Sequence, residues 1–160
     1  MENVVINKPK TLYDLMGQVA EAIELAPGNY YQQGWEEPVE NLAMYEGPYK
    51  EACGTAYCRA GWMVNLLEAP TARGLHHNTS GKAFSLLTKA DIPASEAMEL
   101  FRGSACTRFG DPGSPGYVKE GVDGVKRFMA RHEDKLKAFK LKGVLDDNGR
   151  ISIDRLRKAS

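Results

Sequence analysis

The chain has 160 residues, 42% hydrophobic and 26% charged, which is the composition of an ordinary globular domain. No apolar run approaches the about 20 residues that cross a bilayer, and no hydrophobic leader segment is present, so we expect one globular domain over 1–160 in the cytoplasm, without a membrane partner. Three cysteines are an odd number, which does not indicate a disulfide framework and favours a reducing compartment.

The formal net charge of zero is unevenly distributed along the chain. Residues 1–117 hold nine Lys or Arg against fourteen Asp or Glu, and residues 118–160 hold twelve against seven. The two parts therefore carry −5 and +5, which indicates that they face each other or share a dipolar surface. A basic terminal segment keeps nucleic acid open as a partner, but it is not favoured because no nucleic-acid-binding motif accompanies it.

The first elements are a short strand and an amphipathic helix. The run 4–6 (Val-Val-Ile) is β-prone. Thr11 then predicts a helix N-terminus, with Asp14 as the second member of a variant capping box. The helix is predicted by apolar residues at helical spacing, namely Leu12, Leu15, Met16, Val19 and Ile23.

Residues 28–52 have little periodicity and contain five aromatic residues. A segment of this length without regular structure is often functional. Tyr and Trp are favoured at the energetic centres of protein interfaces. We therefore predict a binding role for Tyr30, Tyr31 and Trp35.

The segment 55–67 predicts a central helix without a polar face. It is apolar on all sides except at Arg59 and Asn65, and such a helix is normally buried. The other helices are expected to pack around it.

Three further helices are predicted. One covers 81–89, and a second follows Pro93 and is expected to bury Ala94, Ala97, Met98 and Phe101. A loop over 104–117 precedes the third helix, at about 119–140, whose beginning is left open by Gly121 and Gly124. Its predicted inner face consists of Val122, Val125, Phe128, Met129, His132, Leu136 and Phe139.

The end of the chain predicts β-structure. Residues 144–153 alternate in character around Asn148-Gly149, a typical hairpin turn, and the run 4–6 is a candidate third strand. The predicted fold class is therefore mainly α (α+β). It has about five helices around the central helix 55–67 and a small terminal β-hairpin or three-stranded sheet.

Two weak patterns for cysteine chemistry are present. Cys53 and Cys58 lie near the beginning of the central helix, where the helix dipole lowers a thiol pKa, and a histidine such as His76 would complete a nucleophile and base. A zinc site from Cys53, Cys58, Cys106 and His76 or His77 matches the usual ligand spacing poorly. Free cysteine is among the most buried residue types, so we expect packing roles, with no metal and no cofactor.

Arg59 is the most informative polar residue, because a buried guanidinium must be paired. Either an acidic side chain from the N-terminal part of the chain holds it, or it faces a pocket that holds an anion. Glu51 and Glu68 flank the helix on different turns. Structural pairing is the favoured interpretation, and the sequence does not name the partner. Because of the second possibility, Arg59 joins Tyr30, Tyr31 and Trp35 as a candidate binding residue.

The string Cys53-Gly-Thr, Cys58, Ala-Gly-Trp62 and a later Leu-Phe helix ending at Phe101 resemble a family of small uncharacterised proteins of bacteriophages and their bacterial hosts. The resemblance covers about residues 12–101, and Arg59 departs from it because the family pattern is usually aliphatic there. The resemblance implies a phage-type context, the bacterial host cell as location, and no mechanism.

The predicted function is that of a non-enzymatic, phage-type accessory protein that binds a host or phage protein. Small size, the lack of a complete catalytic set and the aromatic segment favour it. A cysteine-dependent enzyme using Cys53 or Cys58 with a histidine is the first alternative. A nucleic-acid-associated factor acting through the basic C-terminal segment is the second.

Overall fold

The structure is a computed structural model, and it describes residues 8–25, 36–38, 55–57, 59–67, 79–101 and 114–158. Within these residues the chain is mainly α-helical. The α-helices are α1 (Leu12–Leu25), α3 (Arg59–Leu67), α4 (Thr79–Lys89), α5 (Ala94–Phe101), α7 (Pro115–Arg131), α8 (Glu133–Ala138) and α9 (Ile153–Lys158). The remaining elements are a 3₁₀ helix, η3 (Leu141–Gly143), and two strands, β1 (Glu36–Pro38) and β2 (Thr55–Tyr57). No described helix is both long and apolar enough to cross a membrane.

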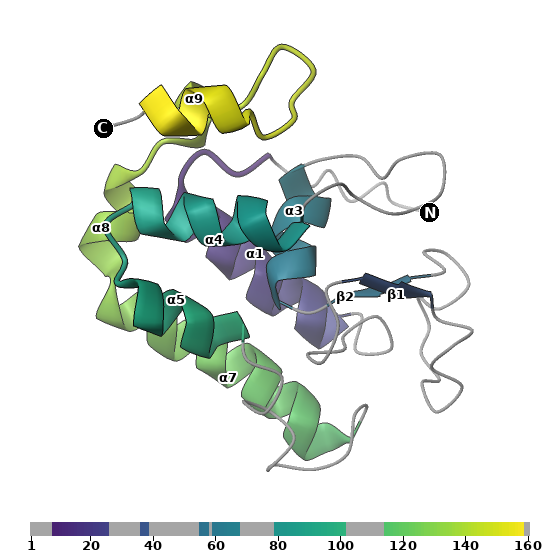
Figure 1. The fold of residues 1–160 in the computed structure, drawn as a ribbon. Helices are drawn as coiled ribbons and strands as arrows, with labels where there is room; N and C mark the ends of the chain where they lie inside the picture. Colours follow the sequence, from purple (N-terminus) through teal and green to yellow (C-terminus); the bar gives the residue numbers. More distant parts are fainter. Residues whose placement is uncertain are drawn as a thin grey trace.

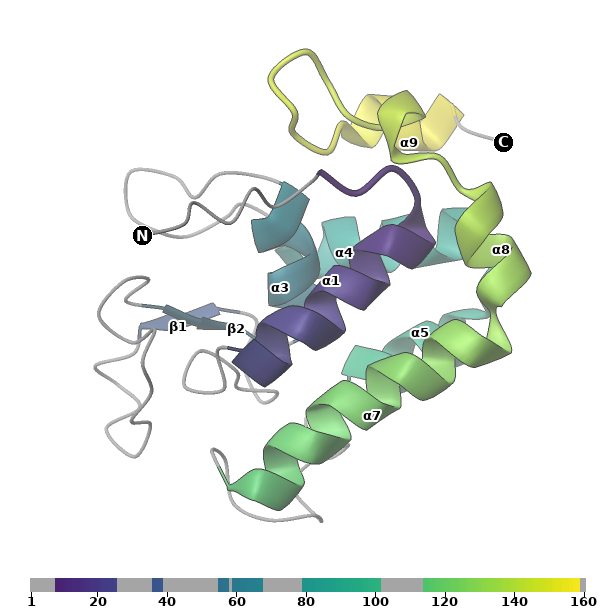
Figure 2. The ribbon, with the colours of Figure 1, turned by 180° about the vertical axis from the view of Figure 1, so that it is seen from behind.

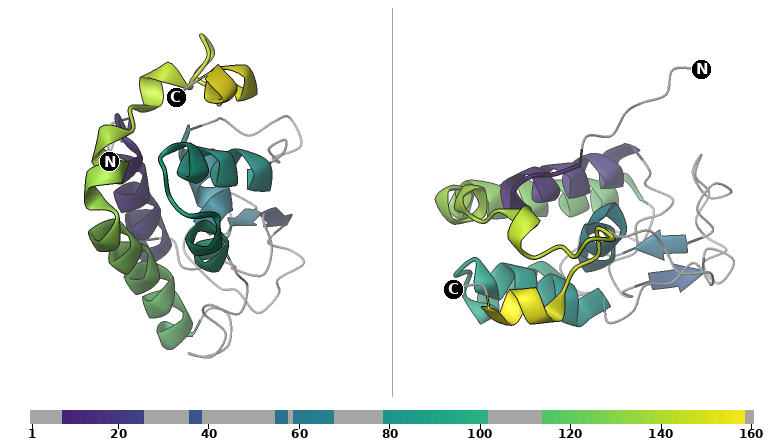
Figure 3. Two further views of the ribbon diagram at one scale, coloured as in Figure 1. Left: turned by 60° about the vertical axis from the view of Figure 1, so that its left-hand side comes forward. Right: turned by 90° about the horizontal axis from the view of Figure 1, so that it is seen from above.

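The helices form two layers with α3 between them. α1 and α7 lie side by side, and α8 continues from α7 (Figures 1 and 2). α4 and α5 form the second layer, which Figure 3 shows from the side and from above. α3 contacts α1 on one side and α4 on the other, and α9 packs on α4 at one end of the molecule.

The core lies where the inner faces of α1, α3, α4 and α7 meet. The apolar stripe of α1 is completely buried, and so are Met63 and Val64 of α3. The beginning of α1 is fixed by the predicted capping box: the Asp14 amide donates to Thr11 Oγ1 (3.1 Å), and the Thr11 amide donates to Asp14 Oδ2 (3.1 Å). The predicted inner face of the helix after Gly121 is likewise buried at Val122, Val125, Phe128 and Leu136.

The predicted boundaries of the central helix are wrong at the N-terminal end. Residues Thr55–Tyr57 form strand β2, which pairs antiparallel with β1 in the register Glu36 with Tyr57 and Pro38 with Thr55. The helix begins at Arg59, and its residues 59–64 are buried. An all-apolar segment indicates burial equally well for a strand and for a helix, so periodicity could not separate the two here.

The single long helix predicted at 119–140 is two helices, α7 and α8, which meet at His132. α7 begins earlier than predicted, at Pro115, because Ser114 is its N-cap and accepts a hydrogen bond from the Tyr117 amide (3.4 Å). Ser followed by Pro at the first helical position is a common helix start.

The predicted terminal β-hairpin or three-stranded sheet is also wrong. Between 141 and 158 the only ladder contact is an isolated bridge between Leu145 and Ile151, and the chain enters α9 at Ile153. Ser152 begins this helix, because its Oγ accepts a hydrogen bond from the Arg155 amide (3.2 Å) and its carbonyl accepts one from Leu156 (2.9 Å). The candidate third strand, 4–6, lies outside the described residues.

The turn at Asn148-Gly149 is present as predicted, and it gives a first test. Gly149 has φ +77°, a left-handed conformation that disfavours a Cβ. We expect Gly149→Ala to lower the free energy of unfolding by about 1 kcal/mol. Gly143→Ala is the control, because Gly143 has no positive φ and a Cβ there meets nothing within 4 Å. Urea unfolding of both variants measures the difference. Equal stabilities would contradict the left-handed conformation of Gly149.

Candidate functional site at the junction of α3, α5 and α7

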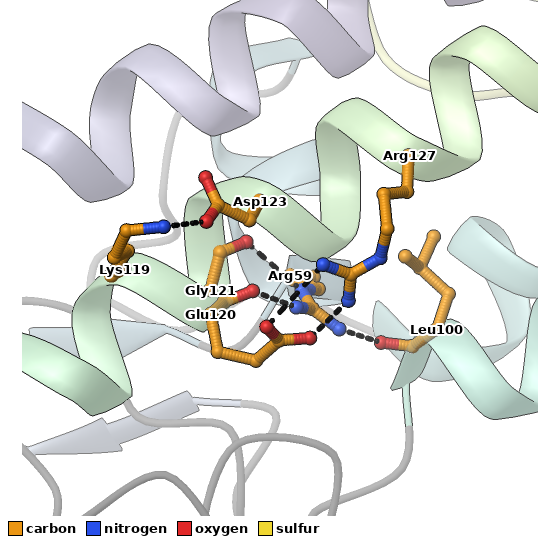
Figure 4. Close-up of polar contacts among 7 residues, drawn as sticks. All are labelled: Arg59, Leu100, Lys119, Glu120, Gly121, Asp123 and Arg127. Atoms are coloured by element: carbon orange, nitrogen blue, oxygen red, sulfur yellow. Dashed lines mark hydrogen bonds and ion pairs between the residues drawn. The ribbon is translucent and has the colours of Figure 1, made fainter.

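Arg59, the first residue of α3, is the only predicted site residue within the described part of the chain. It is 2% exposed, and its guanidinium donates three hydrogen bonds to main-chain carbonyls (Figure 4). Nε donates to Gly121 O (3.3 Å), Nη2 to Glu120 O (2.7 Å) and Nη1 to Leu100 O (3.0 Å). One side chain of α3 therefore connects α5 and α7.

The Leu100 carbonyl explains why a cation is useful at this position. It lies in the last turn of α5, where the final four carbonyls of a helix have no partner within the helix. These carbonyls carry the negative end of the helix dipole, so a guanidinium is a favourable partner. The carbonyls of Glu120 and Gly121 lie inside α7, and Arg59 adds a second hydrogen bond to each of these helical acceptors.

Gly124 makes room for the guanidinium against α7. A Cβ built on Gly124 would lie 2.2 Å from Nη2 of Arg59 and 3.0 Å from its Cζ. Because the Arg59 side chain is buried and bonded to three carbonyls, it cannot move away freely. A glycine that is unfavourable for helix formation is therefore required here by packing.

A groove of about 410 Å³ lies between α5 and α7, with Arg59 at its base. Its walls carry charges of both signs. The lining residues are Arg59, Ser95, Glu96, Glu99, Leu100, Glu120, Gly124, Arg127, Phe128 and Arg131.

The two arginines at the edge of the groove are each held by a glutamate. Arg127 forms an ion pair with Glu120, whose side chain is 10% exposed, whereas that of Arg127 is 60% exposed. Arg131, 66% exposed, lies 3.5 Å from Oε1 of Glu96. Both guanidinium groups are thus held at the surface by a glutamate.

His132 lies at the end of α7, next to Glu96 of the groove. Its Nε2 lies 2.7 Å from Oε2 of Glu96, and its ring centroid is 5.0 Å from that of Phe128. Both contacting atoms are shielded from solvent, but their relative orientation does not meet hydrogen-bond geometry. His132 therefore packs against Glu96 and Phe128 at the α7–α8 junction.

The outer face of α7 and α8 is a solvated, internally paired surface. Lys119 pairs with Asp123 and Lys137 with Glu133, each four residues apart (Figure 4 shows the first pair). The hydrogen bond from Lys119 lowers the pKa of Asp123 below its ordinary value of 3.8, and the bond to Glu133 raises the pKa of Lys137. These exposed pairs contribute little to stability.

The arrangement explains what Arg59 can and cannot do. The sequence left open an acidic partner or a bound anion, whereas the three hydrogen bonds to α5 and α7 all go to main-chain carbonyls.

 Since its donors are engaged by the protein itself, Arg59 acts as a brace between the three helices. This supports the predicted structural pairing of Arg59 and identifies partners that residue types alone did not name.

The other predicted site residues cannot be placed. Tyr30, Tyr31, Trp35, Cys53, Cys58 and His76 all lie outside the described residues, as do His77 and Cys106. Within the described ranges, no group of three or more His, Cys, Asp or Glu side chains is placed to hold a metal ion.

Sequence reasoning missed most of the groove. On α5, Met98 was predicted to be buried and is 55% exposed, and Ala94 is exposed as well. Ala97 and Phe101 are buried as predicted, and Leu100 is buried in addition. The available signal was the pair Gly121 and Gly124 inside an otherwise regular helix, which indicates a close approach by another group.

Comparison of the chain with protein-family models, with curated proteins and with solved structures finds no match.

Proposed function

We propose that this chain is a non-enzymatic, phage-type accessory protein that binds a protein of the phage or of its bacterial host through the groove between α5 and α7. The observation that carries the proposal is the groove itself, where two exposed arginines are each held by a glutamate. The phage-type context rests on the resemblance of the Cys-Gly-Thr and Ala-Gly-Trp62 strings alone.

The residue types at the groove suit a protein partner. Arginine is enriched in protein interfaces and is frequent among the residues that dominate binding energy. Arg127 and Arg131 are already oriented by Glu120 and Glu96, so little conformational freedom is lost when a partner binds. A partner segment that carries carboxylates would match these guanidinium groups.

The aromatic residues Tyr30, Tyr31 and Trp35 extend the proposal from the sequence. Their residue types are those expected at a binding surface, and they supply large contact areas with few rotatable bonds. They stay predicted contact residues, and this prediction depends on residue type alone.

Affinity capture with a matched pair of variants tests this function. Arg131 and Lys119 are both exposed on α7 and paired with a carboxylate, but only Arg131 lines the groove. We expect a tagged wild-type chain and Lys119→Ala to retain the same protein from lysate of a phage-infected bacterium. Arg131→Ala should reduce the retained amount about tenfold, as the loss of one central contact does.

The captured protein is then purified and its dissociation constant measured for all three chains. An equal loss of affinity in Lys119→Ala and Arg131→Ala would contradict the assignment of the binding surface to the groove. The absence of any protein retained by the wild-type chain above a tag-only control would contradict the binding function.

A further inference from the structure

A basic surface lies at the end of the molecule that carries α9, whereas α7, which lines the groove, extends toward the opposite end (Figure 1). It is built from two short segments, 8–10 and 140–158, that are remote in sequence. Eight exposed cationic side chains belong to it, and we call them the terminal basic surface: Lys8, Lys10, Lys140, Lys142, Arg150, Arg155, Arg157 and Lys158.

Main-chain hydrogen bonds bring the two segments together. The Leu12 amide donates to Phe139 O (3.1 Å), the Leu141 amide donates to Lys10 O (2.9 Å), and Thr11 forms a bridge with Lys140. The turn at Gly149 lies close as well, since Lys8 Nζ is 3.8 Å from the position of a Cβ on this glycine. The basic charges of both chain ends therefore lie on one part of the surface.

The cationic side chains of α9 face solvent because the apolar side of this helix packs on the protein. Leu156 is 2% exposed, and Lys89 of α4 donates to the Arg157 carbonyl (3.4 Å). Arg155, Arg157 and Lys158 consequently remain on the solvent side of the helix.

The cations of this surface differ from those of α7 and α8 in their pairing. On α7 and α8, five of the six exposed cations form ion pairs: Lys119, Arg127, Arg131, Lys135 and Lys137. On the terminal basic surface only Arg155 does, at 3.6 Å from Asp147. The other seven form no ion pair with any described residue.

The nearby acidic residues offset this charge only in part. The two segments and the first turn of α1 contain four carboxylates, Asp14, Asp146, Asp147 and Asp154. Two of these carboxylates accept hydrogen bonds from main-chain amides. Asp14 accepts from Lys10 and Thr11, and Asp146 accepts from Asn148 and Arg150. An excess of unpaired positive charge therefore remains in a chain whose net charge is zero.

We propose that the terminal basic surface binds the phosphate backbone of double-stranded DNA without sequence preference. Lysine and arginine side chains neutralise phosphates and release condensed counterions, which supplies essentially all of the free energy of non-specific binding. A duplex suits this surface better than a single strand, because single-strand binding relies on aromatic residues on which bases stack. Phe139 is the only aromatic residue in 8–10 and 139–158, and it packs against the core.

The proposal is tested by fluorescence anisotropy with a labelled DNA duplex of about 24 base pairs at increasing KCl, starting at about 50 mM, where backbone contacts are strong. The test variant combines Lys142→Gln, Arg150→Gln and Arg157→Gln. The control variant combines Lys119→Gln, Lys126→Gln and Lys137→Gln, which changes the net charge equally but on α7 and α8. Circular dichroism melting curves verify that both variants fold.

The wild-type chain and the control variant are expected to bind with similar affinity. The test variant should bind at least tenfold more weakly at the lowest salt concentration. Its plot of log affinity against log salt should be less steep by about 2 to 3, since each phosphate contact contributes about 0.9. Three results would overturn the proposal: no binding by the wild-type chain, equal weakening of both variants, or competition by polyglutamate or anionic lipid vesicles as effective as competition by unlabelled duplex.

Discussion

Replacing Arg59 with methionine is expected to lower the free energy of unfolding by about 2 to 3 kcal/mol. Methionine keeps much of the apolar stem but removes the guanidinium from three carbonyls. The Leu100 carbonyl, at the end of α5, loses a charged hydrogen-bond donor, and an unsatisfied buried acceptor costs about 1 to 3 kcal/mol. The carbonyls of Glu120 and Gly121 lie within α7, so their loss is smaller.

Urea unfolding measures this effect, and two further variants interpret it. Arg59→Lys keeps the charge but lacks the planar fork of donors, so it should restore less than half of the lost stability. Arg131→Met is the control, because that side chain is 66% exposed and its ion pair lies at the surface. Its effect should stay below about 1 kcal/mol. Equal effects of Arg59→Met and Arg131→Met would show that Arg59 does not brace the helices.

Gly124→Ala is expected to destabilise the protein by about 1 to 2 kcal/mol. In an open helix position this substitution would stabilise by about 1 kcal/mol. Here the new Cβ lies 2.2 Å from Nη2 of Arg59 and displaces a buried, hydrogen-bonded group, and overpacking of this kind typically costs about 1 to 3 kcal/mol. The unfavourable effect on packing therefore exceeds the gain in helix propensity.

Gly17→Ala is the matched control for this prediction. Gly17 lies inside α1, and a Cβ there meets only Met129 Cε, at an ordinary contact distance of 3.5 Å. This variant should be more stable than wild type by about 0.5 to 1 kcal/mol. Thermal and urea unfolding of both variants should give shifts of opposite sign. A stabilising effect of Gly124→Ala would mean that the guanidinium can leave its place without cost.

Local sequence signals predicted the parts of the fold that local interactions determine. The capping box of Thr11 and Asp14 needs only neighbouring residues, and it is present as predicted. The inner face of α7 and α8 follows from helical periodicity, which does not depend on the identity of the packing partner. Arg59 stood out because a charge in an apolar segment requires a partner.

The partner itself could not be predicted, because it is formed by groups that every residue type carries. The Leu100 and Gly121 carbonyls reach Arg59 across 41 and 62 residues of sequence. Residue types therefore do not indicate which main-chain carbonyl will accept a hydrogen bond from Arg59. Gly124 left a signal, but an isolated glycine in a helix indicates a close approach without saying to what.

The errors at 55–57 and 144–153 have a common cause. Short apolar runs fit a strand and a helix almost equally well, so the surrounding structure decides between them. Thr55–Tyr57 pairs with β1, whereas Ser152 begins a helix where an extended strand was predicted. The exposure of Met98 is a similar case, since the eight-residue helix α5 offers too few turns to define its buried face by periodicity.

The role of Arg59 as a brace is tested most directly by a double-mutant cycle with Arg59→Met and Gly124→Ala. If the guanidinium lies against Gly124, the alanine should cost about 1 to 2 kcal/mol in the wild-type background and little or nothing once Arg59 is methionine. The free energies of unfolding would then be non-additive by about 1 to 2 kcal/mol, as expected for residues in contact. Additive effects would contradict this role and leave the guanidinium free for another function.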